Sequence, residues 1–217
     1  MTELSTVQQL IVAFPPILLA VSFHELAHGW VALRLGDHTA QMLGRLSLNP
    51  LRHIDPVGTI IVPIVLYLTA GVIFGWAKPV PIDWRNLRRP QRDMALVAAA
   101  GPAANLLMAI AWAVLLKLGA WLDGSLPWLS APLIYMGLTG IIVNLLLAAL
   151  NLIPLPPLDG SRVASALMPA RWARVYNRIE PYGLFVLLLL LLSGGLQTLL
   201  MPVLGGIEQL AYGILKL

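Results

Sequence analysis

The chain contains 217 residues, of which 59% are hydrophobic and 11% are charged, and its formal net charge at pH 7 is +4. Soluble domains carry about 25% charged residues, so this composition excludes a water-soluble globular protein and indicates a membrane protein. The positive charge does not indicate nucleic-acid binding, because the lysines and arginines lie in the short breaks between apolar runs, as the positive-inside rule describes. Cysteine is absent, which excludes disulfides, thiol nucleophiles and cysteine metal sites.

Four apolar runs are long enough to cross a lipid bilayer as helices, since a helical span needs about 20 apolar residues. These runs comprise residues 7–33, 94–122, 132–156 and 182–204. We therefore predict an all-α polytopic membrane protein with about four spanning helices. The last run is expected to continue into a short interfacial helix over 206–217, so that 182–217 forms a C-terminal span with its interfacial helix.

Two segments between the first and second runs differ from them in pattern. Residues 41–56 alternate between apolar side chains and polar or cationic ones. An alternation with a period of two is typical of strands, so we predict a short β-hairpin or strand element there. Residues 57–75 are apolar, but they are near the minimum length for a span and are interrupted by glycine and proline. We predict that this segment is re-entrant.

The first run contains the pattern H-E-x-x-H at His24, Glu25 and His28. Ionisable side chains inside a spanning helix are costly and therefore mark functional sites. Residues four apart share one helix face, which lets His24 and His28 present two imidazoles to one cation. Glu25 is displaced by about 100° around the axis and can accept a proton from water beside the metal. The alternative interpretation is two buried histidines satisfied by hydrogen bonds.

A third ligand is expected, because catalytic zinc usually has three protein ligands. Without cysteine it must be His, Asp or Glu. Asp159 is the best placed, since it follows three prolines that unwind the end of run 132–156, and irregular backbone at membrane depth lines cavities. The alternative is a turn or helix-capping aspartate before Gly160. The other candidates are interpreted as structural, surface or interfacial residues: His38, His53, Glu180 and Glu208.

Three motifs together resemble the site-2 protease family of intramembrane zinc metalloproteases. They are HELAH at 24–28, AGPAAN at 100–105 and NLIPLPPLDG at 151–160. The resemblance implies hydrolysis of peptide bonds within or next to transmembrane segments of membrane-protein substrates. We expect one membrane-embedded metalloprotease domain over 1–217, with its catalytic core over about 7–165, in a compact form without a PDZ domain.

The resemblance also implies roles for individual residues. It makes His24, His28 and Asp159 the ligands of one Zn²⁺ per chain. It makes Glu25 the general base that takes a proton from water and returns it to the leaving amine. It places Asn151 near the catalytic centre, where the side chain would support the substrate or the transition state.

Two further features are predicted to assist the substrate. Asn105 follows Gly101 and Pro102 at the start of the second run, and we predict that it faces the site and gives similar support; the alternative is a packing role with a satisfied amide. The strand element over 41–56 lies where such proteins carry a strand that pairs with an unwound substrate by strand addition.

The predicted site constrains the topology. Both histidines lie toward the C-terminal end of the first run, and Asp159 follows the C-terminal end of run 132–156, so these two runs must be parallel. That requires 57–75 to enter and leave on one side. Nearly all lysines and arginines then share the side of the zinc site, which the positive-inside rule places at the cytoplasmic face. We expect an integral protein of a bacterial or archaeal cell membrane, with both termini outside.

Two alternatives from other functional classes remain. A membrane metal-ion transporter would also carry intramembrane histidine and aspartate, but transporters often show inverted repeats and have no need of a glutamate between the histidines. A non-catalytic scaffold relative would not need the complete set of ligands and base. The sequence does not predict the substrate or the oligomeric state.

Overall fold

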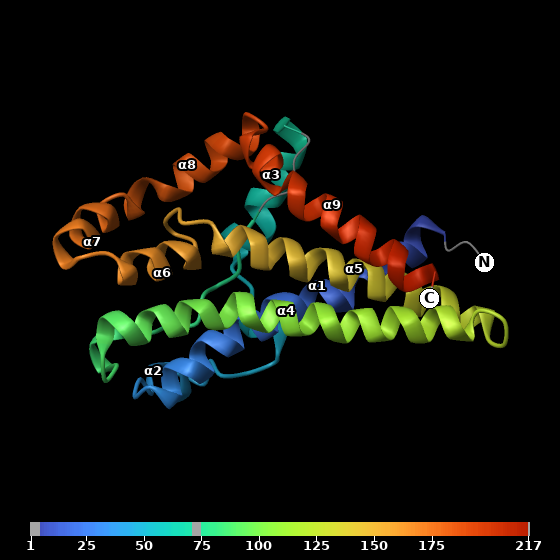
Figure 1. Cartoon of the computed structure of the whole chain (residues 1–217), viewed down its shortest axis with the longest axis horizontal. Helices are drawn as coiled ribbons and strands as arrows, with labels where there is room; N and C mark the ends of the chain where they lie inside the picture. The colour runs from blue at the N-terminus through green and yellow to red at the C-terminus, as the bar shows by residue number, and fades with distance from the viewer. Residues whose placement is uncertain (1–4, 71–74, 217) are drawn as a thin grey trace.

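The computed structural model describes residues 5–70 and 75–216. These residues form helices and helical turns, and they contain no strand (Figure 1). The helices are α1 (Thr6–Arg34), α2 (Thr39–Met42), α3 (Val62–Ala70), α4 (Pro90–Leu122), α5 (Pro127–Leu152), α6 (Asp159–Leu167), α7 (Ala170–Asn177), α8 (Glu180–Leu192) and α9 (Gly195–Lys216). Shorter helical turns are η1 (Pro50–His53), η2 (Pro56–Ile61) and η3 (Trp84–Asn86).

Helices α1, α4 and α5 form the centre of the molecule. Each is long and apolar enough to cross a membrane. They pack against one another, with α1 and α5 running in the same direction and α4 running in the opposite one (Figure 1). Helices α7 and α8 are bent by 61° where they meet, and they pass the same test only as a pair. The prediction of about four spanning helices is therefore corrected: residues 5–70 and 75–216 contain three such helices, or four if the bent pair crosses.

The C-terminal apolar stretch folds as two helices and not as one span over 182–204. Helix α8 ends at Leu192 and α9 begins at Gly195, with Gly194 between them at a φ of +76°. Glycine adopts a positive φ readily and thereby ends helices, so the helix breaks although the composition stays apolar. Helix α9 then continues through the range predicted as an interfacial helix, as far as Lys216.

The predicted β-hairpin over 41–56 is wrong, because none of the described residues is in a strand. The range begins in α2 and later contains η1. Side chains satisfy its backbone locally: Asn49 accepts a hydrogen bond from the Leu51 N–H, and the His53 ring donates one to the Ser47 carbonyl. Such bonds offer the backbone an alternative to a strand ladder, and the alternating pattern alone supplied no partner strand.

The apolar segment 57–75 contains the short helix α3, and its two described ends lie side by side. The Trp76 N–H donates a hydrogen bond of 3.0 Å to the Gly58 carbonyl. The Thr59 hydroxyl donates one of 2.9 Å to the Trp76 carbonyl. Residues 71–74 of the predicted segment lie outside the described residues.

Glycines allow α4 and α5 to approach closely in one half of their interface. Gly137 lies against Leu116 and Gly140 lies against the Trp112 ring, so that neither position has room for a Cβ. Small residues permit such contacts between membrane helices. An apolar cluster surrounds them, formed by Trp112, Leu116, Ile134, Ile141 and Ile207. Because Ile207 belongs to α9, the C-terminal helix closes this side of the bundle.

Candidate metal centre

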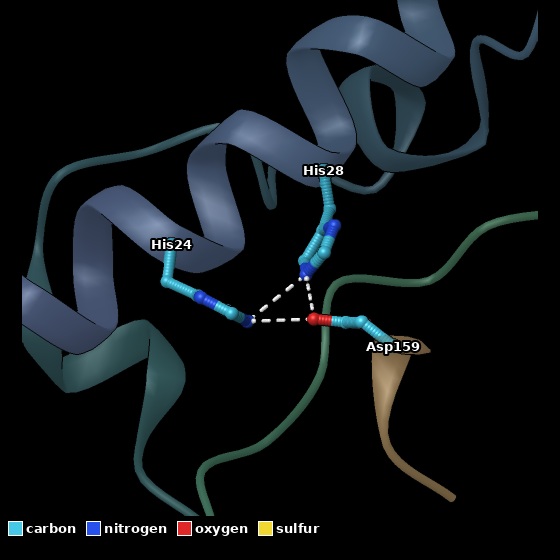
Figure 2. A group of neighbouring side chains, drawn as sticks. All are labelled: His24, His28 and Asp159. Carbon is cyan, nitrogen blue, oxygen red and sulfur yellow. Dashed lines mark hydrogen bonds and ion pairs between the residues drawn. The ribbon is translucent and has the colours of Figure 1, made fainter. Parts of the chain in front are cut away.

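Three side chains from two separate elements meet inside the bundle (Figure 2). His24 and His28 project from one face of α1, and Asp159 projects from the first residue of α6. The two Nε2 atoms lie 3.0 Å apart, and each lies 3.2 Å from Oδ2 of Asp159. Both histidines are buried and the aspartate is partly buried. The three donor atoms therefore surround one small volume, where they could hold a metal ion.

Hydrogen bonds on the far side of each ring assign the ring protons. Nδ1 of His28 lies 2.7 Å from the Val97 carbonyl, which can only accept, so this nitrogen carries the proton. Nδ1 of His24 lies 2.6 Å from Oδ1 of Asn105, which also accepts. Each Nε2 therefore presents a lone pair to the other Nε2 and to Asp159.

This arrangement of acceptors fits a cation. Oδ2 of Asp159 is buried and has no hydrogen-bond partner among the described residues. The two imidazole nitrogens beside it carry lone pairs. Three acceptors this close repel one another unless a cation lies between them. Two imidazoles and one carboxylate form a donor set that suits Zn²⁺, so the residues present fit a zinc ion.

A glycine of α4 makes the contact with α1 possible. A Cβ at Gly101 would collide with the rings of both His24 and His28. The Val97 carbonyl, one turn earlier on α4, accepts a hydrogen bond from His28. Helix α4 therefore offers the imidazoles space at Gly101 and a hydrogen-bond acceptor at Val97.

The end of α5 and the start of α6 position the Asp159 carboxylate beside the imidazoles. Helix α5 ends at Leu152, and residues 153–158 leave it as an irregular, proline-rich stretch. A Cβ at Gly160 would collide with the Leu152 carbonyl, so glycine permits this close return of the chain. The N-cap position belongs to Leu158. Asp159 is thus not the helix-capping residue, and its carboxylate is directed at the imidazoles.

Glu25 lies on the neighbouring face of α1, and a backbone amide holds its carboxylate. The Val80 N–H donates a hydrogen bond of 2.7 Å to Oε2 of Glu25. Val80 belongs to a stretch without secondary structure, in which the Lys78 and Pro79 carbonyls accept hydrogen bonds from the Arg45 guanidinium, at 3.1 and 3.3 Å. The direction of the Glu25 carboxylate is therefore fixed by backbone that is itself anchored.

A buried aspartate fastens the same stretch to the end of α1. Asp37 accepts hydrogen bonds from the N–H and hydroxyl of Thr39, from the Asp83 N–H and from the Asn86 amide. Burial raises the pKa of Asp37, but these hydrogen bonds lower it further, so that its pKa lies below the ordinary value. The ionised carboxylate therefore locates the stretch that carries the Val80 amide.

The two asparagines predicted to support the substrate lie in different settings. Asn105 is fully buried and is bonded to His24. Asn151 is partly buried near the end of α5, and its amide donates to the Leu147 carbonyl one turn earlier, at 3.0 Å. Asn105 therefore contacts the metal centre directly, whereas the hydrogen bond of Asn151 stays within its own helix.

The other acids and histidines considered as a third ligand lie elsewhere. His38 is exposed and bonded to Gln41, whereas His53 is buried and bonded to a backbone carbonyl. Glu180 forms an ion pair with an arginine, and Glu208 is exposed on α9. None of these four belongs to the metal group within the described chain.

The sequence did not lead us to predict three groups at the centre: the side chain of Asn144, the carbonyl of Val97 and the amide of Val80. Asn144 carried a usable signal, because an asparagine in the middle of an apolar run marks a buried hydrogen bond between helices. The two backbone groups carried none, since every residue has them and only the fold selects which are used.

Comparison with known proteins supports the same chemistry. Residues 128–194 match Peptidase family M50. The chain is 42% identical over 180 residues to a protein of Bacillus subtilis (strain 168) that is named as a zinc metalloprotease, YwhC, covering 82% of this chain and 79% of that protein.

More distant relatives carry similar names. A protein of Mycolicibacterium smegmatis named as a zinc metalloprotease, Rip2, is 27% identical over 181 residues, covering 83% of this chain and 66% of that protein. A protein of Methanocaldococcus jannaschii named as a zinc metalloprotease, MJ0611, is 29% identical over 165 residues, covering 76% of this chain and 74% of that protein. No solved structure matches the chain.

Proposed function

The chain belongs to peptidase family M50, the site-2 protease family of zinc metalloproteases, and from this premise we propose that it hydrolyses peptide bonds within or next to transmembrane segments of membrane-protein substrates. It is a membrane protein, and its described residues include three helices of spanning length and composition. The observation that carries the proposal is the convergence of His24, His28 and Asp159 among those helices.

In this proposal His24 and His28 bind one Zn²⁺ through Nε2, and Asp159 binds it through Oδ2. A zinc ion bound there supplies a Lewis acid that polarises the scissile carbonyl and lowers the pKa of water. The assigned ring protons support these roles, because both nitrogens already present lone pairs without any rotation of the rings.

Glu25 is proposed as the general base. Its carboxylate takes a proton from the attacking water and returns it to the nitrogen of the leaving amine. The hydrogen bond from the Val80 N–H supports this role, because it fixes Oε2 of Glu25 and leaves Oε1 to accept the proton. Glu25 contributes no atom to the metal group, so it remains available for proton transfer.

The substrate in this proposal is a transmembrane polypeptide that has locally unwound. The carbonyls of an intact helix are already hydrogen-bonded, so a peptide bond must leave the helix before water can attack it. Asn151 is proposed to support the substrate or the transition state, because it lies in the last turn of α5, just before the irregular stretch that leads to Asp159. Asn105 is proposed to act through its contact with His24.

We also propose that the centre lies toward the cytoplasmic face. Arginines gather where α1 ends and α4 begins, and α2, α6 and α7 lie at the same end of the molecule (Figure 1). They include Arg34, Arg45, Arg85, Arg88, Arg89 and Arg92. Positive charge favours the cytoplasmic side. The start of α1 and the end of α9 lie at the opposite end, which this orientation places outside.

The test uses purified wild-type and Glu25→Gln proteins in detergent with a panel of tagged single-span substrates. Zinc content is measured in the same samples. Glu25→Gln is expected to keep one zinc per chain and to lose at least about 100-fold of the cleavage rate, since a general base contributes about 10²–10⁴-fold. Glu208→Gln, which changes an exposed glutamate of α9, is the matched control and should cleave at the wild-type rate.

Two results would contradict the proposal. Equal cleavage by wild type and Glu25→Gln would remove Glu25 from the chemistry. Zinc-loaded wild-type protein that cleaves no substrate but carries zinc into vesicles would favour a transporter.

A further inference from the structure

We propose that Asn144 is a positioning residue for the metal centre and that it acts on His24 through Asn105. The inference rests on the proposed function, because it takes His24 as a metal ligand. It concerns which of the two ring nitrogens of His24 is free to bind.

Four hydrogen bonds join three helices in one chain of buried polar groups. Nδ1 of His24 on α1 lies 2.6 Å from Oδ1 of Asn105 on α4. The amide nitrogen of Asn105 donates to the Ala20 carbonyl at 3.2 Å and to Oδ1 of Asn144 at 2.8 Å. The amide nitrogen of Asn144 on α5 donates to the Gly140 carbonyl at 2.8 Å.

Two backbone carbonyls give this chain a single direction, because a carbonyl oxygen can only accept. Gly140 requires the nitrogen of Asn144 on its side, so Asn144 presents its oxygen to Asn105. Ala20 and Asn144 together then require the nitrogen of Asn105 on their side. The oxygen of Asn105 is left facing His24, and Nδ1 of that ring must carry the proton.

Reversal of the Asn105 amide would disable the ligand. Its N–H₂ group would face Nδ1 of His24 and move the ring proton to Nε2. That proton would point at Asp159 and occupy the position from which the nitrogen binds a metal. The reversed amide would also place its oxygen against those of Ala20 and Asn144, so Asn144 and Ala20 disfavour it together.

His28 does not require a further group to fix the position of its ring proton. Its Nδ1 faces the carbonyl of Val97, a backbone group that cannot exchange donor for acceptor. A side-chain amide can do so by rotating through 180°, and therefore the ring held by Asn105 requires a further group to fix the amide. Asn144 supplies that group.

The burial of Asn105 and Asn144 makes their hydrogen bonds decisive for the orientation of the Asn105 amide. Asn105 and Asn144 are both 0% exposed, so water cannot replace a lost partner, and a buried amide without one is costly. Polar residues also join membrane helices merely by packing and hydrogen bonding. That structural role would stabilise the bundle, but it would not select a ring proton, and the two roles can be separated by experiment.

The first readout is the position of the ring proton in metal-free protein. Histidine ¹⁵N NMR distinguishes a protonated Nδ1 from a protonated Nε2, and the chain has only four histidines. The His24 signals are assigned from their absence in His24→Ala. Wild type is expected to show His24 protonated at Nδ1, whereas Asn144→Leu is expected to show a mixture of both forms with His28 unchanged.

The second readout is zinc affinity, measured by competition with a chelator. Asn144→Leu is expected to bind zinc about 10-fold more weakly, within the range of about 10–100-fold for groups that orient a ligand. Asn144→Asp should recover near wild-type affinity, because a neutral carboxylic acid donates to Gly140 and accepts from Asn105. Ser130→Ala is the matched control: it removes the hydrogen bond that another fully buried polar residue of α5 donates to Asp123, and it should leave zinc affinity unchanged.

The outcomes separate this inference from the proposed function. Absence of zinc from wild-type protein overturns both. Tight zinc binding by wild type, with the same His24 protonation and the same affinity in Asn144→Leu, overturns the inference alone. If Asn144→Leu does not fold, measurements on metal-free wild type and on Asn144→Asp test the inference instead. A His24 ring protonated at Nε2 and not at Nδ1 in metal-free wild type would overturn it. Loss of zinc affinity in Asn144→Asp would also overturn it.

Discussion

Helix α4 approaches its neighbours through glycine contacts in two regions, one apolar and one polar, and the two regions have different roles. In the apolar region, Gly137 and Gly140 of α5 lie against Leu116 and Trp112, and apolar side chains fill the remaining space. In the polar region, Gly101 of α4 makes room for two imidazoles of α1, and buried asparagines link the helices. The absence of a Cβ at glycine therefore permits tight helix packing in one region and the approach of the candidate metal ligands in the other.

The two regions are expected to control different properties: stability in the apolar region and metal binding in the polar region. Apolar packing depends on volume, and its loss lowers the free energy of unfolding. The polar region depends on the direction of each donor and acceptor, and an error there leaves atoms that cannot bind the metal. Substitutions in the two regions should therefore change different measured quantities.

The largest effect is expected for Gly101→Ala. The added methyl group collides with both imidazoles, and losing a group that orients a metal ligand costs about 10–100-fold in metal affinity. Because both imidazoles are displaced, zinc affinity, measured by chelator competition, should fall by about 100-fold. Gly205→Ala is the control, because a Cβ there meets no atom of the described residues within 4 Å. Wild-type zinc affinity in Gly101→Ala would contradict the assigned geometry.

Leu116→Ala should have the largest effect on stability. Leu116 is 0% exposed in the apolar cluster, and deleting a buried leucine side chain to alanine costs about 2–5 kcal/mol. The free energy of unfolding is measured by titration with a denaturing detergent. Zinc affinity of the folded variant should be unchanged, so a parallel loss of zinc would show that the two regions are not independent.

A smaller loss of stability is expected for Gly137→Ala. Its Cβ would lie 2.7 Å from Cβ of Leu116 and 2.8 Å from the Leu116 backbone, so the helices must separate. Overpacking of this kind costs about 1–3 kcal/mol. At Gly205 the same substitution is expected to raise stability by up to about 1 kcal/mol through helix propensity. Equal effects at the two positions would exclude close packing as the cause.

The smallest effect is expected from acid acting on Asp37. Its folded-state pKa lies below the unfolded value, so the ionised carboxylate stabilises the protein above the unfolded pKa of about 3.9. This contribution is lost as the pH falls through the folded pKa. The melting temperature of metal-free protein should therefore fall more steeply below about pH 4 in wild type than in Asp37→Asn. Parallel curves would contradict this role of Asp37.

The sequence was most informative where local geometry decides the outcome. A separation of four residues on a helix brings His24 and His28 to one face whatever surrounds them, and the prolines before Asp159 unwind α5 by removing backbone donors. Long apolar runs likewise predict α1, α4 and α5, because length and composition alone define a span.

The sequence was least informative where partners come from distant parts of the chain. The alternation in 41–56 predicts a strand only if a neighbouring strand exists, and local side-chain bonds satisfied that backbone instead. The break at Gly194 falls at a pair of glycines in a mostly apolar run, and composition alone did not distinguish one span from two helices. Asn144 acquires its role only because the fold places it against Asn105 from another helix.

The central claim is that His24, His28 and Asp159 hold one zinc ion, and X-ray absorption at the zinc edge of the purified protein tests it most directly. We predict one zinc per chain, two imidazole nitrogens at about 2.0–2.1 Å, carboxylate or water oxygen at about 2.0–2.2 Å, and loss of the imidazole signal in His24→Ala. Absence of zinc, or a bound zinc whose spectrum contains no pair of imidazoles, would contradict the account.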